Sequence, residues 1–147
     1  MRLIIIILFF YFFSINLYSK DEYFRTLRND IVNLRQGPSF DYPIKIFYKK
    51  KFLPVLVQDS SENFRKIRDH ENNSGWIHIS QLSKKKAVIT IVDESYLYKR
   101  PTIYARPLAI LKKGRLVMLT KCRSTWCKVR DIKFSGWIKK DNLWGKF

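Results

Sequence analysis

The sequence has few of the residues that mark several classes of protein. Five glycines, five prolines and two cysteines among 147 residues exclude a collagen-like chain and a disulfide-dense scaffold. The length leaves room for one or two compact units and excludes a large multidomain enzyme. A hydrophobic content of 46% is too high for a disordered basic tail. We therefore expect a small folded protein.

Acidic residues are also scarce. Twelve Asp and Glu stand against 29 Lys and Arg, which gives a formal net charge of +17. Such a charge favours contact with polyanions, such as nucleic acid, anionic lipid or acidic polymers. The excess lies in one half of the chain: residues 20–83 carry 11 basic against 8 acidic residues, or +3, and residues 84–147 carry 17 against 4, or +13.

The longest apolar run lies at the N-terminus. Arg2 precedes eleven apolar residues at 3–13, and the small residue Ser19 precedes a charged stretch. This pattern predicts an export signal over residues 1–19 with cleavage after Ser19. The run is too short to span a membrane, although Leu17 at the third position before the cut leaves an uncleaved N-terminal anchor as the alternative. Export predicts a periplasmic or secreted protein, argues against nucleic acid as a partner and places the cysteines in an oxidising compartment.

The rest of the chain lacks a long stretch with apolar residues at helical spacing. It has short apolar or alternating runs, such as residues 44–48, 87–92 and 126–129, separated by polar or glycine-containing turns. Runs of this kind are typical of an all-β fold built as a small barrel or sandwich. We expect little helix.

The short runs occur twice in the same order. The Gly-Trp-Ile motif at residues 75–77 recurs at 136–138, and the segment at 64–69 recurs at 126–131. In each copy a glycine permits a tight bend and the following tryptophan lies on a half-buried strand, which suggests a five-stranded barrel. A unit of about 60 residues is marginal for burying a core, so we expect the two units to pack together.

The order, spacing and duplication of these motifs resemble the tandem bacterial SH3-like (SH3b) proteins that Gram-negative bacteria export. The matching segments are residues 33–39, 48–57 and 75–83 in the first unit and 105–107, 126–129 and 136–145 in the second. The resemblance covers essentially the whole mature chain and implies two SH3-like domains, at 20–83 and 84–147, after the signal peptide.

The resemblance also implies a function. SH3b domains are generally non-catalytic modules that bind peptides, peptidoglycan or other cell-wall ligands, so we expect a periplasmic or cell-envelope binding module with a peptide, peptidoglycan or envelope-protein ligand. Two alternatives remain: a basic β-barrel that binds nucleic acid, and an envelope enzyme or inhibitor. No residue pattern indicates a cofactor.

Cys122 and Cys127 are placed to form a disulfide. If Ser124 and Thr125 form a two-residue hairpin loop, the two cysteines lie directly opposite each other on paired strands, at a separation that suits a bond. The closed loop is small, so the bond would stabilise the fold by about 2 kcal/mol. The alternatives are two free thiols or a cross-strand apolar pair, and a redox-active pair is disfavoured because no Cys-x-x-Cys motif is present.

Candidate catalytic and metal-binding residues are few. A Cys/His hydrolase would need one cysteine beside His70 or His78, yet the cysteines are better used by each other. The two histidines stand eight residues apart, beside Asp69 and Glu71, in a spacing that matches no standard zinc site. We therefore expect neither an active site nor a metal site.

An exposed aromatic groove is the favoured binding site, because SH3-type barrels can hold an extended ligand by stacking it on flat side chains. The candidates are Phe40, Tyr42 and Trp76 in the first unit and Tyr104, Trp126 and Trp137 in the second. The tryptophans are also explained by packing in the core or between the units. Tyr42 and Tyr104 lie in turn-rich segments and are expected to be the exposed members.

The basic excess gives a second candidate surface. It comprises Lys84, Lys85, Lys86, Lys99, Arg100, Lys112, Lys113, Lys139 and Lys140. These residues either form solvated faces and turns or make a salt-sensitive contact with peptidoglycan carboxylates or membrane phosphates.

Overall fold

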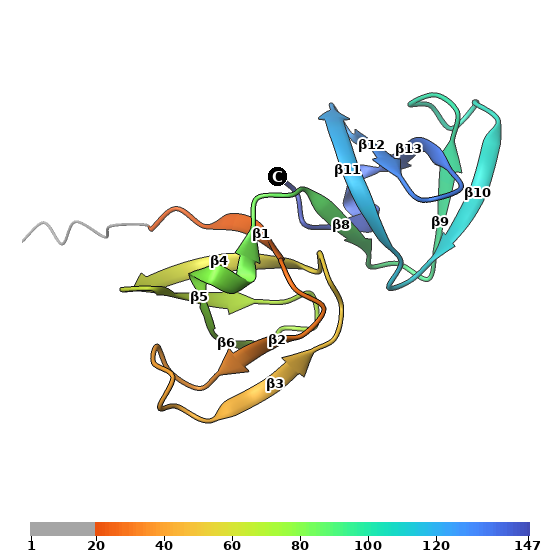
Figure 1. Cartoon of the computed structure of the whole chain (residues 1–147). Coiled ribbons are helices and arrows are strands. Elements are labelled where there is room, and N and C mark those ends of the chain that lie inside the picture. The colour runs from red at the N-terminus through yellow and green to blue at the C-terminus, as the bar shows by residue number, and fades with distance from the viewer. Residues whose placement is uncertain (1–19) are drawn as a thin grey trace, which may run out of the picture.

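The structure of the protein, a computed structural model, describes residues 20–147. The predicted signal peptide and its cleavage after Ser19 lie outside these residues. Within them the chain forms β-strands and two short 3-10 turns, with no α-helix. The strands make two antiparallel sheets, one from each half of the chain, and each sheet curls around its own core (Figure 1). The predicted all-β fold of two tandem units is confirmed.

The first sheet has the strand order β3-β2-β6-β5-β4-β1-β7. Its strands are β1 (Tyr23–Leu27), β2 (Val32–Arg35), β3 (Ile44–Tyr48), β4 (Pro54–Ser61), β5 (Phe64–Arg68), β6 (Ser74–His78) and β7 (Leu82–Ser83). The 3-10 turn η1 (Ile79–Gln81) joins β6 to β7.

The second sheet repeats this order as β10-β9-β13-β12-β11-β8-β14. Its strands are β8 (Ala87–Thr90), β9 (Glu94–Tyr98), β10 (Pro107–Lys112), β11 (Leu116–Arg123), β12 (Trp126–Arg130), β13 (Ser135–Lys139) and β14 (Leu143–Trp144), with the 3-10 turn η2 (Lys140–Asn142) before the last strand. Each sheet has seven strands where the sequence suggested five. One of the additional strands in each sheet, β7 or β14, is only two residues long and leaves no apolar run to detect.

The two Gly-Trp motifs occupy the same place in both sheets, where one strand crosses another closely. A Cβ added to Gly75 would lie 2.6 Å from the carbonyl oxygen of Arg35, and one added to Gly136 would lie 2.7 Å from that of Tyr98. These contacts bring β6 against β2 and β13 against β9 and close each barrel. Glycine is needed at both positions because any side chain would push the strands apart.

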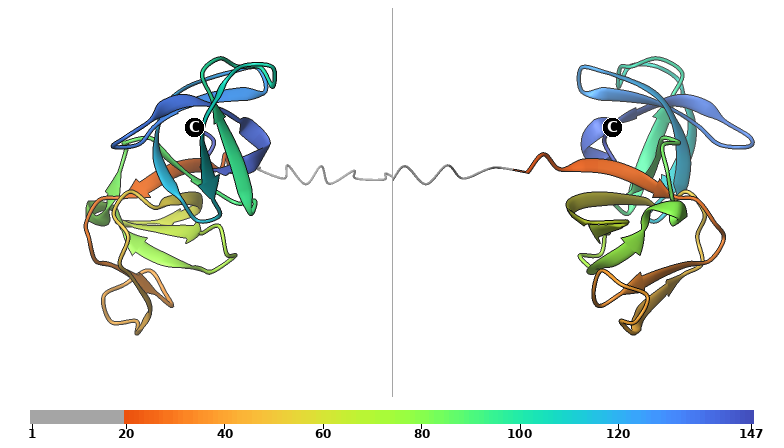
Figure 2. Two further views of the ribbon diagram at one scale, coloured as in Figure 1. Left: turned by 90° about the vertical axis from the view of Figure 1, so that its right-hand side faces the viewer. Right: turned by 60° about the vertical axis from the view of Figure 1, so that its left-hand side comes forward.

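The two barrels share a packed junction. Strand β8 is buried on both faces: Val88 belongs to the core of the second barrel, whereas Ile89 belongs to the core of the first. Trp144 also packs on the core of the first barrel and meets the ring of Phe24 edge-on at 5.4 Å. Figure 2 shows the C-terminal end of the chain between the two units. The predicted packing of the units against each other is therefore observed.

Candidate functional site

An exposed aromatic residue of the first barrel lies on a support of two other rings. Phe40, in the loop between β2 and β3, is 63% exposed. Its ring centroid lies 5.2 Å from that of Phe64 and 5.1 Å from that of His78, and the latter two rings are 5.1 Å apart. We call Phe40, Phe64 and His78 the aromatic shelf. One member is presented to solvent while the other two fix its position.

Arg35 holds the loop that carries the shelf. Its guanidinium donates hydrogen bonds to the carbonyl oxygens of Phe40 (3.1 Å) and Tyr42 (2.8 Å) and lies 5.4 Å from the centre of the Phe40 ring. The Tyr42 ring lies against Gly37, where a Cβ would approach it to 2.5 Å. The loop is thus ordered before any ligand arrives, which lowers the entropy cost of binding.

The six predicted aromatic residues do not meet in one groove. Phe40, Tyr42 and Tyr104 are exposed, the last by 90%. Trp76 and Trp126 are half-buried, and Trp137 is only 8% exposed. In the second barrel the Trp126 ring meets Tyr98 edge-on at 5.6 Å, so this barrel lacks the arrangement found around Phe40.

Arg35, Phe64 and His78 were not among the sequence-based candidates. The repeat could have drawn attention to Phe64 and His78, because they replace Trp126 and Lys139 of the second unit. Their contact with Phe40 could not be foreseen, since it depends on how the β2–β3 loop folds over the sheet.

Cys122 and Cys127 form the predicted disulfide. They are directly paired residues of β11 and β12, with Cα atoms 4.0 Å apart. Cys127 lies in the core of the second barrel and Cys122 packs against it. The bond fixes the register of the hairpin at the end where its turn, Ser124 and Thr125, begins.

Asp69 forms a buried polar cluster in the first barrel that the sequence did not reveal. Its carboxylate accepts hydrogen bonds from the Tyr48 hydroxyl (2.8 Å), the Glu71 N–H (2.9 Å) and the Asn73 N–H (2.8 Å) and side-chain amide (2.9 Å). Burial, together with the hydrogen bond to Asp69, raises the pKa of Tyr48 far above its ordinary value. The cluster shapes the turn between β5 and β6 and is too enclosed to act on a ligand.

The sequence matches a family of known domains twice. Residues 28–84 and 92–145 each match the bacterial SH3 domain. The chain belongs to the bacterial SH3 domain family. No curated protein matches its sequence.

Several solved structures show a distant likeness to this chain. NlpC2 of Trichomonas vaginalis has 14% identity and a TM-score of 0.40, and the match covers 88% of this chain and 49% of that one. NlpC1 of the same organism has 13% identity and a TM-score of 0.40, and the match covers 88% of this chain and 48% of that one. An NlpC/P60 family protein of Bacillus cereus has 12% identity and a TM-score of 0.37, covering 82% of this chain and 55% of its own. The chain spans about half the length of each of these proteins.

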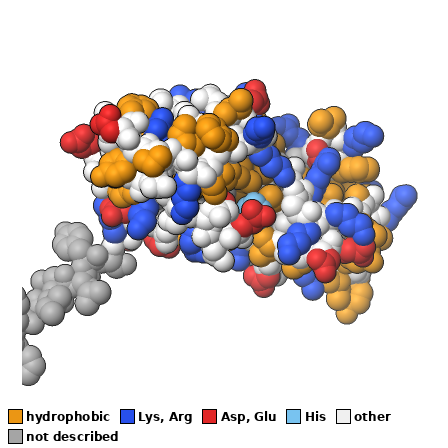
Figure 3. Space-filling model, turned by 90° about the horizontal axis from the view of Figure 1, so that it is seen from below, with side chains coloured by type: hydrophobic (Ala, Val, Ile, Leu, Met, Phe, Trp, Pro, Cys, Tyr) orange, Lys and Arg blue, Asp and Glu red, His pale blue; other side chains and the backbone are white. Residues whose placement is uncertain are grey.

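The second SH3 domain carries most of the basic side chains of the chain. Figure 3 shows Lys and Arg side chains spread over the right-hand part of the molecule, whereas the left-hand part carries broader apolar areas. Lys112 pairs with Glu94, and the ammonium of Lys85 lies 5.1 Å from the centre of the Phe52 ring of the first domain. The predicted basic residues thus lie on several different parts of the domain. Three further cations, Lys121, Arg123 and Lys128, lie on strands β11 and β12.

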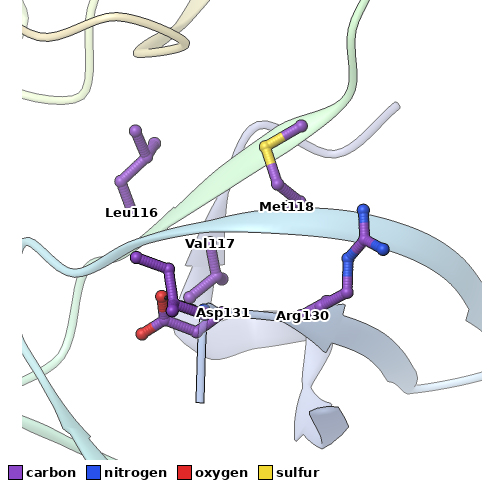
Figure 4. Close-up of a pocket in the computed structure, with 6 residues that line it drawn as sticks. Leu116, Val117, Met118, Arg130 and Asp131 are labelled. Carbon is purple, nitrogen blue, oxygen red and sulfur yellow. Dashed lines mark hydrogen bonds between the residues drawn. The ribbon is translucent and has the colours of Figure 1, made fainter. Parts of the chain in front are cut away.

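A shallow pocket of about 250 Å³ lies on the second SH3 domain near the junction. Leu116 and Met118 of β11 border it, together with Arg130, the last residue of β12, and Asp131, which follows it (Figure 4). Leu116 also packs on the core of the first domain. The pocket is lined by aliphatic side chains together with Arg130 and Asp131, and it has no nucleophile beside a base. Arg115, outside the pocket, hydrogen-bonds to Asp131 and lowers the pKa of its carboxyl group.

Residues 20–147 contain neither a cluster of metal ligands nor a membrane-spanning helix. Among them no three His, Cys, Asp or Glu side chains converge as metal ligands do. In the same range no helix has the length and apolar character needed to cross a membrane.

Proposed function

We propose that the protein is a non-catalytic binding module of the cell envelope. The bacterial SH3 domain is a binding module, and both halves of the chain belong to this family. The Cys122–Cys127 disulfide supports an oxidising compartment, in keeping with export and cleavage near Ser19. The ligand would be a peptide, a peptidoglycan stem peptide or an extended segment of an envelope protein.

The observation that carries the proposal is the exposed ring of Phe40 on the aromatic shelf. An aromatic side chain with two fixed neighbours offers a large apolar contact at low entropy cost. Arg35 orders the loop beneath it through two carbonyl oxygens. An extended peptide could lay an apolar side chain on Phe40 and run along the β2–β3 loop.

Binding of soluble peptidoglycan fragments that retain their stem peptides tests the proposal. Isothermal titration calorimetry should detect binding to the mature chain, and Phe40→Ala should weaken it about tenfold, as expected for the loss of an aromatic anchor. Phe47→Ala is the matched control, because Phe47 is a 59% exposed phenylalanine of β3 in the same domain. Equal loss in both variants, or no binding by the wild type, would refute the proposal.

The compartment is tested separately. Fractionation of cells followed by N-terminal sequencing should recover the chain outside the cytoplasm, beginning near Lys20. Recovery of an intact N-terminus in the cytoplasm would contradict the envelope assignment.

A further inference from the structure

The outer face of strands β11, β12 and β13 in the second domain carries cations around two tryptophans. The register of the sheet sets Lys121 opposite Lys128 and Lys128 opposite Trp137. In the next row Arg123 is opposite Trp126, and Trp126 is opposite Lys139. We call this surface the cationic face, comprising Lys121, Arg123, Trp126, Lys128, Trp137 and Lys139.

Two cations of this face lie over an aromatic ring, and none of the four makes an ion pair within residues 20–147. Lys121 and Arg123 each bring their charge to 5.8 Å from the centre of the Trp137 ring. Three of the four acidic residues of the second domain pair with cations elsewhere, with Lys112, Arg115 and Lys146. The face therefore presents a positive potential that no neighbouring carboxylate offsets.

The first domain shows that the fold does not require these cations. Its equivalent positions pair in the same way: Asp59 with Lys66, Lys66 with Trp76, Ser61 with Phe64, and Phe64 with His78. That face has one Lys and one Asp, a sum of zero, whereas the cationic face has four cations and no carboxylate, a sum of +4. Formation of the fold therefore does not account for the four cations.

The spacing of the cations indicates the shape of the ligand. Arg123 and Lys139 flank Trp126 on the two neighbouring strands, so their backbones are two strand spacings apart, or about 10 Å. Trp126 is half-buried and its ring is fixed by Tyr98. A sugar ring laid on Trp126 would place acidic groups on either side within reach of Arg123 and Lys139.

We propose that the cationic face binds an anionic polysaccharide with one carboxylate per disaccharide. Peptidoglycan glycan strands stripped of their stem peptides have this chemistry, because each muramic acid then carries a free carboxylate. The disulfide in the same hairpin supports an oxidising compartment, which disfavours nucleic acid. A membrane surface is disfavoured because Trp137 is only 8% exposed and the face offers no protruding apolar side chain to insert. The proposal does not depend on peptide binding at the aromatic shelf, which lies in the other domain.

The test uses the mature chain and purified, peptide-stripped glycan strands as the probe. Calorimetry should show binding that weakens as salt is raised, because exposed ion pairs are screened. Strands whose carboxyl groups have been reduced to alcohols should no longer bind. Two competing ligands are measured in parallel: a single-stranded DNA oligomer of equal charge and vesicles containing anionic lipid.

A test variant replaces three cations of the cationic face with the residues that the first domain has at the equivalent positions. Each new residue is therefore one that this fold already accommodates. The variant combines Lys121→Asp, Arg123→Ser and Lys139→His, which changes the charge at neutral pH by −2, −1 and −1. The control combines Lys133→Asp, Arg106→Gln and Lys49→Gln, which changes the charge by the same −4 at exposed loops and turns outside both candidate basic surfaces. Circular dichroism and an intact disulfide show that both variants are folded.

The variant with Lys121→Asp, Arg123→Ser and Lys139→His should bind glycan strands about tenfold or more weakly than the wild type, since three exposed charge contacts are lost. The control should change binding less than about twofold. The proposal is overturned by an equal loss in both variants, by unchanged binding to reduced strands, by tighter binding to DNA or vesicles, or by the absence of binding to the strands.

Discussion

Replacing Asp69 with alanine tests whether the buried polar cluster stabilises the first domain. Asp69 is 1% exposed and accepts four hydrogen bonds. The Tyr48 hydroxyl, which donates to Asp69, would lose its acceptor, and water does not easily reach it because Tyr48 is only 8% exposed. The Glu71 and Asn73 donors lie in the turn and can be hydrated after the change.

These contacts give the expected size of the effect. A buried hydroxyl left without its charged acceptor costs about 2 kcal/mol, and the partly hydrated turn donors add about 1 kcal/mol together. We therefore expect Asp69→Ala to lower the free energy of unfolding by about 3 kcal/mol. The matched control is Asp131→Ala in the second domain, where the carboxylate is held chiefly by the exposed side chain of Arg115. That change should cost about 1 kcal/mol or less.

Urea unfolding followed by circular dichroism and tryptophan fluorescence measures both variants. If the two domains unfold in separate steps, the loss from Asp69→Ala should appear in the transition that Trp76 reports. A loss below about 1 kcal/mol, or one no larger than that of Asp131→Ala, would refute the reasoning from burial.

Further outcomes follow from the same structure. Tyr48 keeps its proton in the folded state, because its pKa there is raised. Its contribution to stability is therefore complete below the unfolded pKa of about 10 and declines above it. The difference in unfolding free energy between the wild type and Tyr48→Phe, measured in urea, should shrink from pH 8 to pH 11. Replacing Cys122 and Cys127 together with alanine should cost about 2 kcal/mol, and thiol titration of the native wild type should find no free thiol. Gly75→Ala and Gly136→Ala should each cost about 2 kcal/mol or more in urea, because the new Cβ would meet a backbone carbonyl oxygen; a loss below about 0.5 kcal/mol would show that the strands separate freely.

The duplication made much of the fold predictable from the sequence. The Gly-Trp motifs, the short alternating runs and the two-residue turn at Ser124 and Thr125 are local features, and local features fix strand positions and hairpin register. The disulfide followed from that register and is confirmed. The aromatic shelf did not follow, because Phe40 and His78 meet only through the path of a loop.

Trp126, Trp137 and Lys139 of the cationic face were candidates from the sequence, whereas Lys121, Arg123 and Lys128 were not, and a bulge in β11 contributes to this difference. The register between β11 and β12 shifts between Leu119 and Lys121, so one residue of β11 is left unpaired there. Strict alternation from the buried Val117 would have put Lys121 and Arg123 inside the barrel. The bulge reverses this, turns Cys122 inward to meet its partner and sends both cations outward onto Trp137.

The packed junction between the domains bears on how two binding sites could act together. Ile89 and Trp144 of the second domain contribute to the core of the first, and Lys50 donates a hydrogen bond to the carbonyl oxygen of Gly114 (2.8 Å). The domains are therefore held at one orientation and are not joined by a flexible linker. A ligand engaging both the shelf and the cationic face gains from effective concentration only if its own length matches that fixed separation. A peptidoglycan fragment that keeps some stem peptides and has lost others is such a candidate, and it should bind more tightly than an equimolar mixture of the two separate ligands.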